Sequence, residues 1–175
     1  SIVNFLFNDQ IHNYFDYMRH VLYLHNLFDS YNVPHLIVDM LESFFVCGMI
    51  KDELERVTQL PIDIQLEKFR ENPFELQYIV DEYHPSKEKE YKLWFEYIKR
   101  SNMSKKFNNL YGAVASAKWF DGHPYRNYFS KITRNCPREG MNGMYIGEMP
   151  KGHPNEQSHT EFAERMFSEI KRRNI

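Results

Sequence analysis

A long amphipathic segment near the start of the chain leads directly into a run of mainly apolar residues, Val33-Pro34-His35-Leu36-Ile37-Val38. Asn8 or Asp9 can cap a helix in the amphipathic segment, whose apolar residues recur at helical spacing as far as Asn32. A short apolar run bounded by turn residues is typical of a strand covered on both faces. The pattern predicts a helix over 9–30 that feeds a buried strand at 33–38, which is half of an α/β unit.

Other periodic segments predict further helices. Apolar residues at helical spacing indicate helices over 51–60, 86–100, 104–118 and 157–172, and Pro61 and Pro73 indicate an irregular stretch between the first two. In the last of these helices the apolar stripe includes Phe162 and Phe167, which we expect in the core. The 175 residues suffice for one compact domain, and no apolar run approaches the roughly 18 residues of a membrane-spanning helix. We expect one domain and no membrane partner.

Charge is segregated along the chain, although the net charge is only −2. Residues 39–98 carry 7 bases and 14 acids, whereas residues 99–138 carry 9 bases and 1 acid, interleaved with aromatic residues. Such a combination of cations and π-faces suits phosphate, nucleic acid or sugar. The alternative is that the acidic residues of 39–98 pair with the basic residues of 99–138, within the chain or on a neighbouring subunit. Little positive electrostatic potential would then remain at the surface. We favour matching, so nucleic acid is not an expected partner.

The most informative motif stands just before the predicted last helix. Gly152-His153-Pro154 is followed by Ser158 and Glu161, which fit a capping box at a helix N-terminus. A residue before Pro is restricted to an extended conformation, so His153 would be held on a short loop backed by a rigid helix. Catalytic bases are commonly presented on such loops. His153 is therefore the candidate general base.

The segment from Gly152 to His159, with the amphipathic helix after it, resembles the closing block of SGNH (GDSL-like) hydrolases, including phage-encoded ones. The leading helix and the run at 33–38 are similar as well, so the resemblance covers about 8–40 and 145–175. It implies a flavodoxin-like three-layer α/β/α sandwich with a parallel sheet. Residues 1–175 would form a single α/β domain of this type, or its C-terminal part with the N-terminal part missing, carrying a mostly helical insertion at about 41–140.

The resemblance also implies hydrolysis of a carboxylic ester, such as an O-acetyl group on a carbohydrate. His153 would be the catalytic base, and Glu148 the carboxylate that orients its imidazole, because Pro150 stands where the family has an Asp. No Gly-Asp-Ser block is present, so the nucleophile is not expected on this chain. The alternative is a non-catalytic structural or interaction protein of a virus particle that retains the scaffold.

Three residues are assigned to substrate binding: Asp39, Asn155 and His123. Asp39 follows the predicted strand at its carboxyl end, the edge where ligands bind in open parallel sheets. The alternative for Asp39 is a cap or turn acid. His123 stands in a second Gly-His-Pro motif, and Asn155 lies two residues after His153.

No metal and no cofactor are expected, because the His and Cys residues lack the paired spacings of common ligand sets. Five histidines are interpreted as surface or core-edge residues: His12, His20, His25, His35 and His84. No secretion signal opens the sequence, which predicts a cytoplasmic or virion location. The expected partners are an ester or carbohydrate substrate and a homo-oligomer or larger viral assembly.

Overall fold

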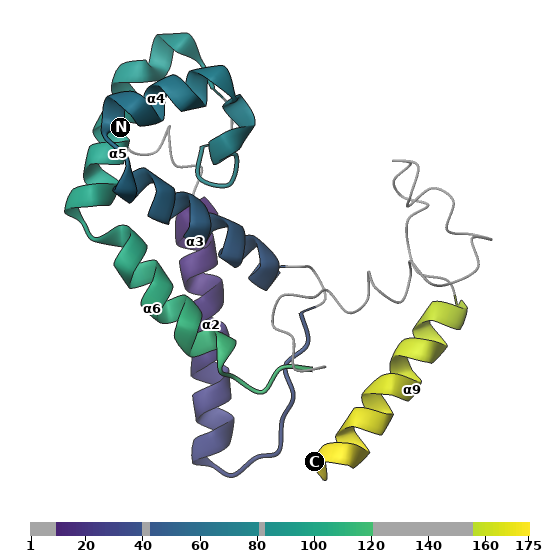
Figure 1. The fold of residues 1–175 in the computed structure, drawn as a ribbon. Helices are drawn as coiled ribbons and strands as arrows, with labels where there is room; N and C mark the ends of the chain where they lie inside the picture. The colour runs from purple at the N-terminus through teal and green to yellow at the C-terminus, as the bar shows by residue number, and fades with distance from the viewer. Residues whose placement is uncertain (1–9, 40–42, 81–82, 121–155) are drawn as a thin grey trace. The chain divides into compact units, whose positions relative to one another are not determined.

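The computed structural model describes residues 10–39, 43–80, 83–120 and 156–175. The described chain is built from helices (Figure 1). In chain order they are α2 (Gln10–Ser30), α3 (Ser43–Gln59), α4 (Ile62–Glu71), the 3₁₀ turns η1 (Pro73–Leu76) and η2 (Pro85–Lys87), α5 (Glu88–Arg100), α6 (Met103–Ala115) and α9 (Glu156–Arg173). No helix among them combines the length and the apolar content needed to cross a membrane.

The chain divides into two compact units. The helical unit comprises Ser1–Leu27 and Phe44–Ala117, and the C-terminal unit comprises Phe28–Ser43 and Lys118–Ile175. α2 runs without interruption through the boundary at Leu27 and Phe28, so residues on this helix keep their helical spacing across it.

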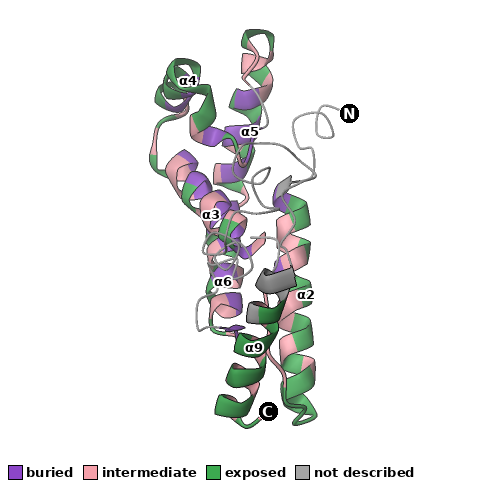
Figure 2. Ribbon diagram, turned by 90° about the vertical axis from the view of Figure 1, so that its right-hand side faces the viewer, coloured by how far each residue is buried: buried purple, intermediate pink, exposed green. Residues whose placement is uncertain are grey.

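Aromatic side chains fill the core of the helical unit. Figure 2 shows buried residues along α3, α5 and α6. Phe44 of α3 stacks on Tyr111 of α6 with ring centroids 4.7 Å apart. Phe69 of α4 meets Tyr91 of α5 edge-on at 5.4 Å. Because aromatic rings bury large apolar areas and pair with preferred geometries, these contacts are a main source of the unit's stability.

Helix α3 begins eight residues earlier than the sequence pattern predicted, at Ser43 rather than residue 51. Its buried side chains recur every three or four residues: Phe44, Cys47, Ile50, Leu54 and Val57. This spacing places them on one face of a helix, where they meet the core. Phe44 and Cys47 therefore belong to the amphipathic stripe of this helix.

Helix α4 occupies most of the stretch that Pro61 and Pro73 led us to predict as irregular. Pro61 precedes the first helical residue, where its missing N–H costs nothing, and its carbonyl accepts a hydrogen bond from the Gln65 N–H at 2.9 Å. Leu66 and Phe69 are buried on one helical face. The two prolines therefore bracket a helix, and the prediction of irregular structure is wrong.

The predicted flavodoxin-like sandwich with a parallel sheet is wrong, because the described part of the chain is all-α and contains no strand. Residues 33–38 are extended, but their only ladder contact in the described chain is an isolated parallel bridge between Ile37 and Trp119. The Ile37 N–H donates to the Lys118 carbonyl at 2.8 Å, and the Phe120 N–H donates to the Ile37 carbonyl at 2.7 Å. A strand needs a neighbour along its length, and a single bridge does not supply one.

The core of the C-terminal unit forms around Phe120. Leu36 and Val38 of the extended segment pack against this ring together with Phe162 and Met166 of α9. Leu36 and Val38 are thus covered by a helix and not by a sheet, whereas Val33 is 44% exposed. Phe167, which the periodicity placed in the core, is instead 58% exposed.

The other helix predictions are confirmed as α2, α5, α6 and α9, each within about three residues at its ends. The described part of the range 41–140 is mostly helical. Its status as an insertion in a larger domain stays a prediction.

Candidate functional site

Four residues assigned from the sequence lie outside the described part of the chain: His153, Glu148, Asn155 and His123. Their roles stay predictions. α9 begins at Glu156, so the helix predicted to follow the Gly-His-Pro motif is present.

Asp39 is described, and it anchors the start of α3. Its side chain is buried, and its Oδ1 accepts a hydrogen bond from the Ser43 N–H at 3.1 Å. Ser43 opens α3, and an N–H in the first turn of a helix has no helical carbonyl to bond. Asp39 therefore acts as a cap, which was the alternative to a ligand-binding role. The sheet edge that suggested ligand binding is not formed among the described residues, and that role stays a prediction.

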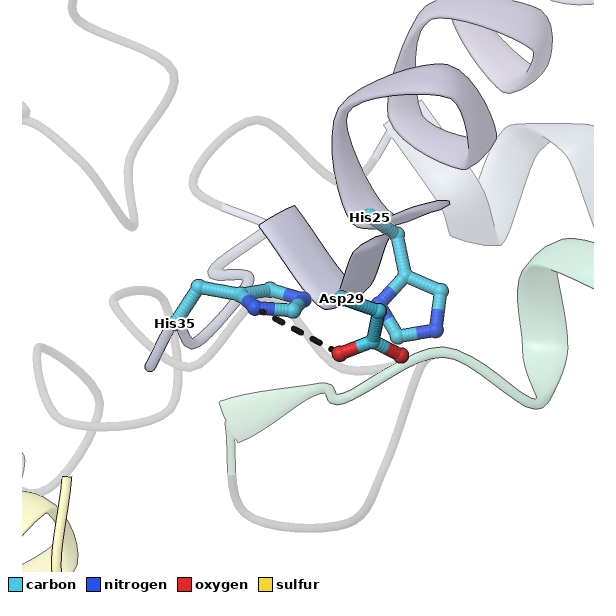
Figure 3. A group of neighbouring side chains, drawn as sticks. All are labelled: His25, Asp29 and His35. Carbon is cyan, nitrogen blue, oxygen red and sulfur yellow. Dashed lines mark ion pairs between the residues drawn. The ribbon is translucent and has the colours of Figure 1, made fainter. Parts of the chain in front are cut away.

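Two histidines and an aspartate gather at the C-terminal end of α2, as Figure 3 shows. His25 and Asp29 are four residues apart on the helix, and His35 follows in the chain after the helix ends. One potential ligand atom from each side chain lies within 4.8 Å of the other two. His35 Nδ1 is 3.9 Å from Asp29 Oδ1. Neither histidine was expected from the sequence to belong to a site.

A cleft of about 440 Å³ lies beside this cluster, within the C-terminal unit. Its lining includes Asp29, His35, Lys118 and Arg173. The Lys118 ammonium pairs with Asp29 Oδ1, and the Arg173 guanidinium pairs with Glu169. Hydrogen bonds from the neighbouring arginines lower the pKa of Glu169 to about 2. The two cations of the cleft are thus each matched by a carboxylate.

A second cleft, of about 620 Å³, lies in the helical unit between α2 and α6. His12, Asp16, Arg19 and Lys106 contribute its charged and polar lining. Arg19 pairs with Asp16 at 3.2 Å across one turn of α2, with both side chains more than half exposed. Solvent weakens such a pair, so this cleft shows no buried or convergent charge that would favour one ligand.

An outward apolar stripe runs along the second half of α2 and includes Tyr31, the residue just after the helix ends at Ser30. Val21, Leu24, Phe28 and Tyr31 follow one another at intervals of three, four and three residues, the heptad spacing of paired helices. Leu24 is 47% exposed, Phe28 36% and Tyr31 73%, whereas Val21 is half-buried. In Figure 2 this end of α2 is coloured mainly as exposed. Contiguous exposed apolar residues commonly mark an interaction surface.

Comparison with known proteins adds no family to this picture. No family model, curated protein or solved structure matches the chain. The resemblance to SGNH hydrolases therefore rests on the residues of the two blocks quoted for it.

The helical unit also contains a buried carboxyl that the sequence did not single out. Glu53 of α3 is only 4% exposed, and the Tyr78 N–H donates to its Oε2 at 3.1 Å. Burial raises the pKa of Glu53 to about 8, against the opposing effects of the Arg56 guanidinium and the N–H groups of Tyr78 and Ile79. We interpret Glu53 as the anchor of the turn after η1, because its hydrogen bonds go to backbone groups there.

Proposed function

We propose that the chain contributes the general base of a carboxylic-ester hydrolase whose substrate is an ester such as an O-acetylated carbohydrate. The observation that supports the proposal most is the packing of the C-terminal unit. The helix that directly follows Gly152-His153-Pro154 packs through Phe162 on Phe120, and Leu36 of the extended segment packs on the same ring. The two sequence blocks that resemble SGNH hydrolases thus share one core.

The chemistry requires more than one imidazole. A neutral His153 would take the proton from a serine hydroxyl, while Glu148 would hold the other ring nitrogen. The nucleophile and the donors that stabilise the oxyanion would come from residues not on this chain. The absence of a sheet from the described residues does not decide this proposal, because one chemistry occurs on unrelated folds.

We expect the 175-residue chain alone to hydrolyse no aryl acetate above the buffer rate. Together with any residues that precede Ser1 in its gene, the same chain should turn the ester over. His153→Ala should then lower kcat by about 10²–10⁴-fold, the usual contribution of a general base. His20→Ala is the control, since it removes an exposed histidine of α2 that has no assigned role and should leave kcat unchanged.

Two results would contradict the hydrolase proposal. One is an extended chain with no turnover of aryl acetate or acetylated xylan, and the other is turnover that survives His153→Ala. Turnover by the chain alone that is abolished by His153→Ala would place the nucleophile on this chain, against our expectation.

A second candidate function is that of an interaction protein, and the outward stripe of α2 favours it. We propose that the stripe pairs with the same stripe of a second copy of this chain. A heptad seam is complementary to itself, and two identical patches close into a symmetric dimer, the commonest oligomer. The four stripe residues are uncharged, so an identical helix meets no like charge along the seam.

We expect the chain to sediment as a dimer and Leu24→Glu to sediment as a monomer, because the new carboxylates would be buried at the seam. Leu93→Glu on α5 is the matched control, because Leu93 is 57% exposed and lies outside the stripe. This variant should remain a dimer. Sedimentation equilibrium measures the mass, and far-UV circular dichroism confirms that both variants keep their helices. A monomeric wild type, or a dimer unaffected by Leu24→Glu, would refute the pairing.

A further inference from the structure

We propose that His25, Asp29 and His35 form a binding site for Zn²⁺ at the C-terminal end of α2. The proposal is independent of both functions proposed above. It rests on three side chains of metal-ligating type whose ligand atoms already lie within 4.8 Å of one another. Figure 3 shows the Asp29 carboxylate between the two imidazole rings.

Local chain geometry fixes the first two ligands. His25 and Asp29 are separated by four residues on an unbroken helix, so their side chains emerge from the same face one turn apart. The i, i+4 spacing is one that helical metal sites use, because it brings two ligand atoms to one ion.

A helix-terminating turn fixes the third ligand. Asn32 adopts the left-handed conformation with φ 54°. Its N–H donates to the Asp29 carbonyl at 3.0 Å, and the Val33 N–H donates to the Phe28 carbonyl at 2.8 Å. These two bonds make a Schellman motif, which ends the helix and reverses the chain. The reversal returns His35 to the last turn of α2, where its ring lies 5.3 Å from the Phe28 ring.

The His35 imidazole is prepared for a metal by its own hydrogen bond. Its Nδ1 lies 3.0 Å from the Val33 carbonyl oxygen, which can only accept. A proton on Nδ1 leaves the lone pair on Nε2, so an ion would bind through Nε2 and not through the Nδ1 that lies 3.9 Å from Asp29 Oδ1. Metal-binding histidines usually donate their other ring nitrogen to a carbonyl or carboxylate in this way. The His35 side chain is 7% exposed, so its orientation is constrained by its surroundings.

The donor set selects the class of ion. Two imidazole nitrogens and one carboxylate oxygen suit Zn²⁺ and other first-row divalent ions better than Ca²⁺ or Mg²⁺, which prefer oxygen. Three protein ligands leave one tetrahedral position for water. Zn–N bonds of about 2.0 Å imply ligand atoms roughly 3.3 Å apart, so side-chain rotations must close the cluster when the ion binds.

Lys118 allows a variant that should strengthen Zn²⁺ binding and not weaken it. Its ammonium pairs with Asp29 Oδ1, so a positive charge now stands beside the carboxylate that the ion would need. An approaching cation must displace this ammonium or bind against its repulsion. Removing the charge with Lys118→Met should therefore tighten Zn²⁺ binding, whereas loss of any ligand should weaken it.

The test is a Co²⁺ titration of the tag-free chain, followed by the d–d absorption of the bound ion, with Zn²⁺ added to displace it. We expect each chain to bind one Co²⁺ that Zn²⁺ displaces. His35→Ala or Asp29→Asn should lower the affinity for the ion at least about tenfold, and Lys118→Met should raise it. Asp16→Asn with His20→Ala is the matched control, because it removes another Asp and His four residues apart on the exposed surface of α2.

Far-UV circular dichroism shows whether each variant keeps its helices, and Asp29→Asn preserves the shape of the side chain. The absence of tetrahedral Co²⁺ absorption in the wild type at millimolar metal would overturn the proposal. Binding that survives His35→Ala and Asp29→Asn would overturn it as well, because the ion would then sit on other residues. An equal loss in the Asp16 and His20 control would show nonspecific surface binding and would also refute the site.

Discussion

Raising the pH from about 5 to 9 is expected to destabilise the helical unit through one buried carboxyl, Glu53, whose folded-state pKa is raised to about 8. Burial causes this, because a carboxylate removed from water loses solvation that its neighbours only partly replace. In the unfolded chain the same group has its ordinary pKa near 4.5.

The direction of the pH effect follows from the two pKa values. Below pH 4.5 Glu53 is protonated in both states and its contribution to stability is fully present. Between pH 4.5 and 8 the unfolded chain releases the proton while the folded chain keeps it, so the free energy of unfolding falls as the pH rises. The total loss is on the order of 5 kcal/mol once the pH exceeds the folded-state pKa.

Glu53→Gln isolates this effect, because glutamine keeps the shape and an acceptor for the Tyr78 N–H but does not ionise. We expect the stability difference between wild type and Glu53→Gln to shift in favour of the variant from pH 5 to 9. Urea unfolding at each pH measures that difference. Glu67→Gln removes an exposed carboxyl of α4 and controls for the change in net charge. Parallel pH profiles for wild type and Glu53→Gln would show that Glu53 does not carry the effect.

Helical periodicity gave most of the described fold, and its failures have physical causes. α2, α5 and α9 were predictable because their apolar residues recur at helical spacing over many turns. The run at 33–38 was misassigned because a short apolar run has no periodicity that distinguishes a strand from an extended segment covered by a helix. α4 was missed because two prolines were interpreted as breakers, although a proline just before a helix is favourable.

The candidate metal cluster, too, can be predicted only in part from the sequence. The spacing of His25 and Asp29 is legible in the sequence, since four residues make about one turn. The return of His35 depends on the left-handed conformation of Asn32 and on two backbone hydrogen bonds, which no residue pattern specifies uniquely. The capping role of Asp39 similarly depends on where α3 begins, and α3 begins earlier than its periodicity predicted.

Phe44→Ala is expected to lower the free energy of unfolding of the helical unit by about 3–5 kcal/mol. The Phe44 side chain is fully buried, and its ring stacks on Tyr111 at 4.7 Å. Truncation removes that contact and leaves a cavity in the core. The cost within this range depends on how far the Tyr111 ring moves into the cavity. A cavity that cannot collapse carries a cost near the upper end of the range.

The adjacent residue supplies the control. Phe45 is 41% exposed on the same helix, so Phe45→Ala should cost about 1 kcal/mol or less. Urea unfolding followed by tryptophan fluorescence in a Trp119→Phe background measures both variants, because Trp94 then reports from the helical unit. Equal losses for the two phenylalanines would mean that the face of α3 assigned to the core is wrong. A large loss of unfolding free energy in Phe44→Ala alone would show that the stability of the helical unit depends on the first turn of α3. The periodicity of the sequence did not predict that turn.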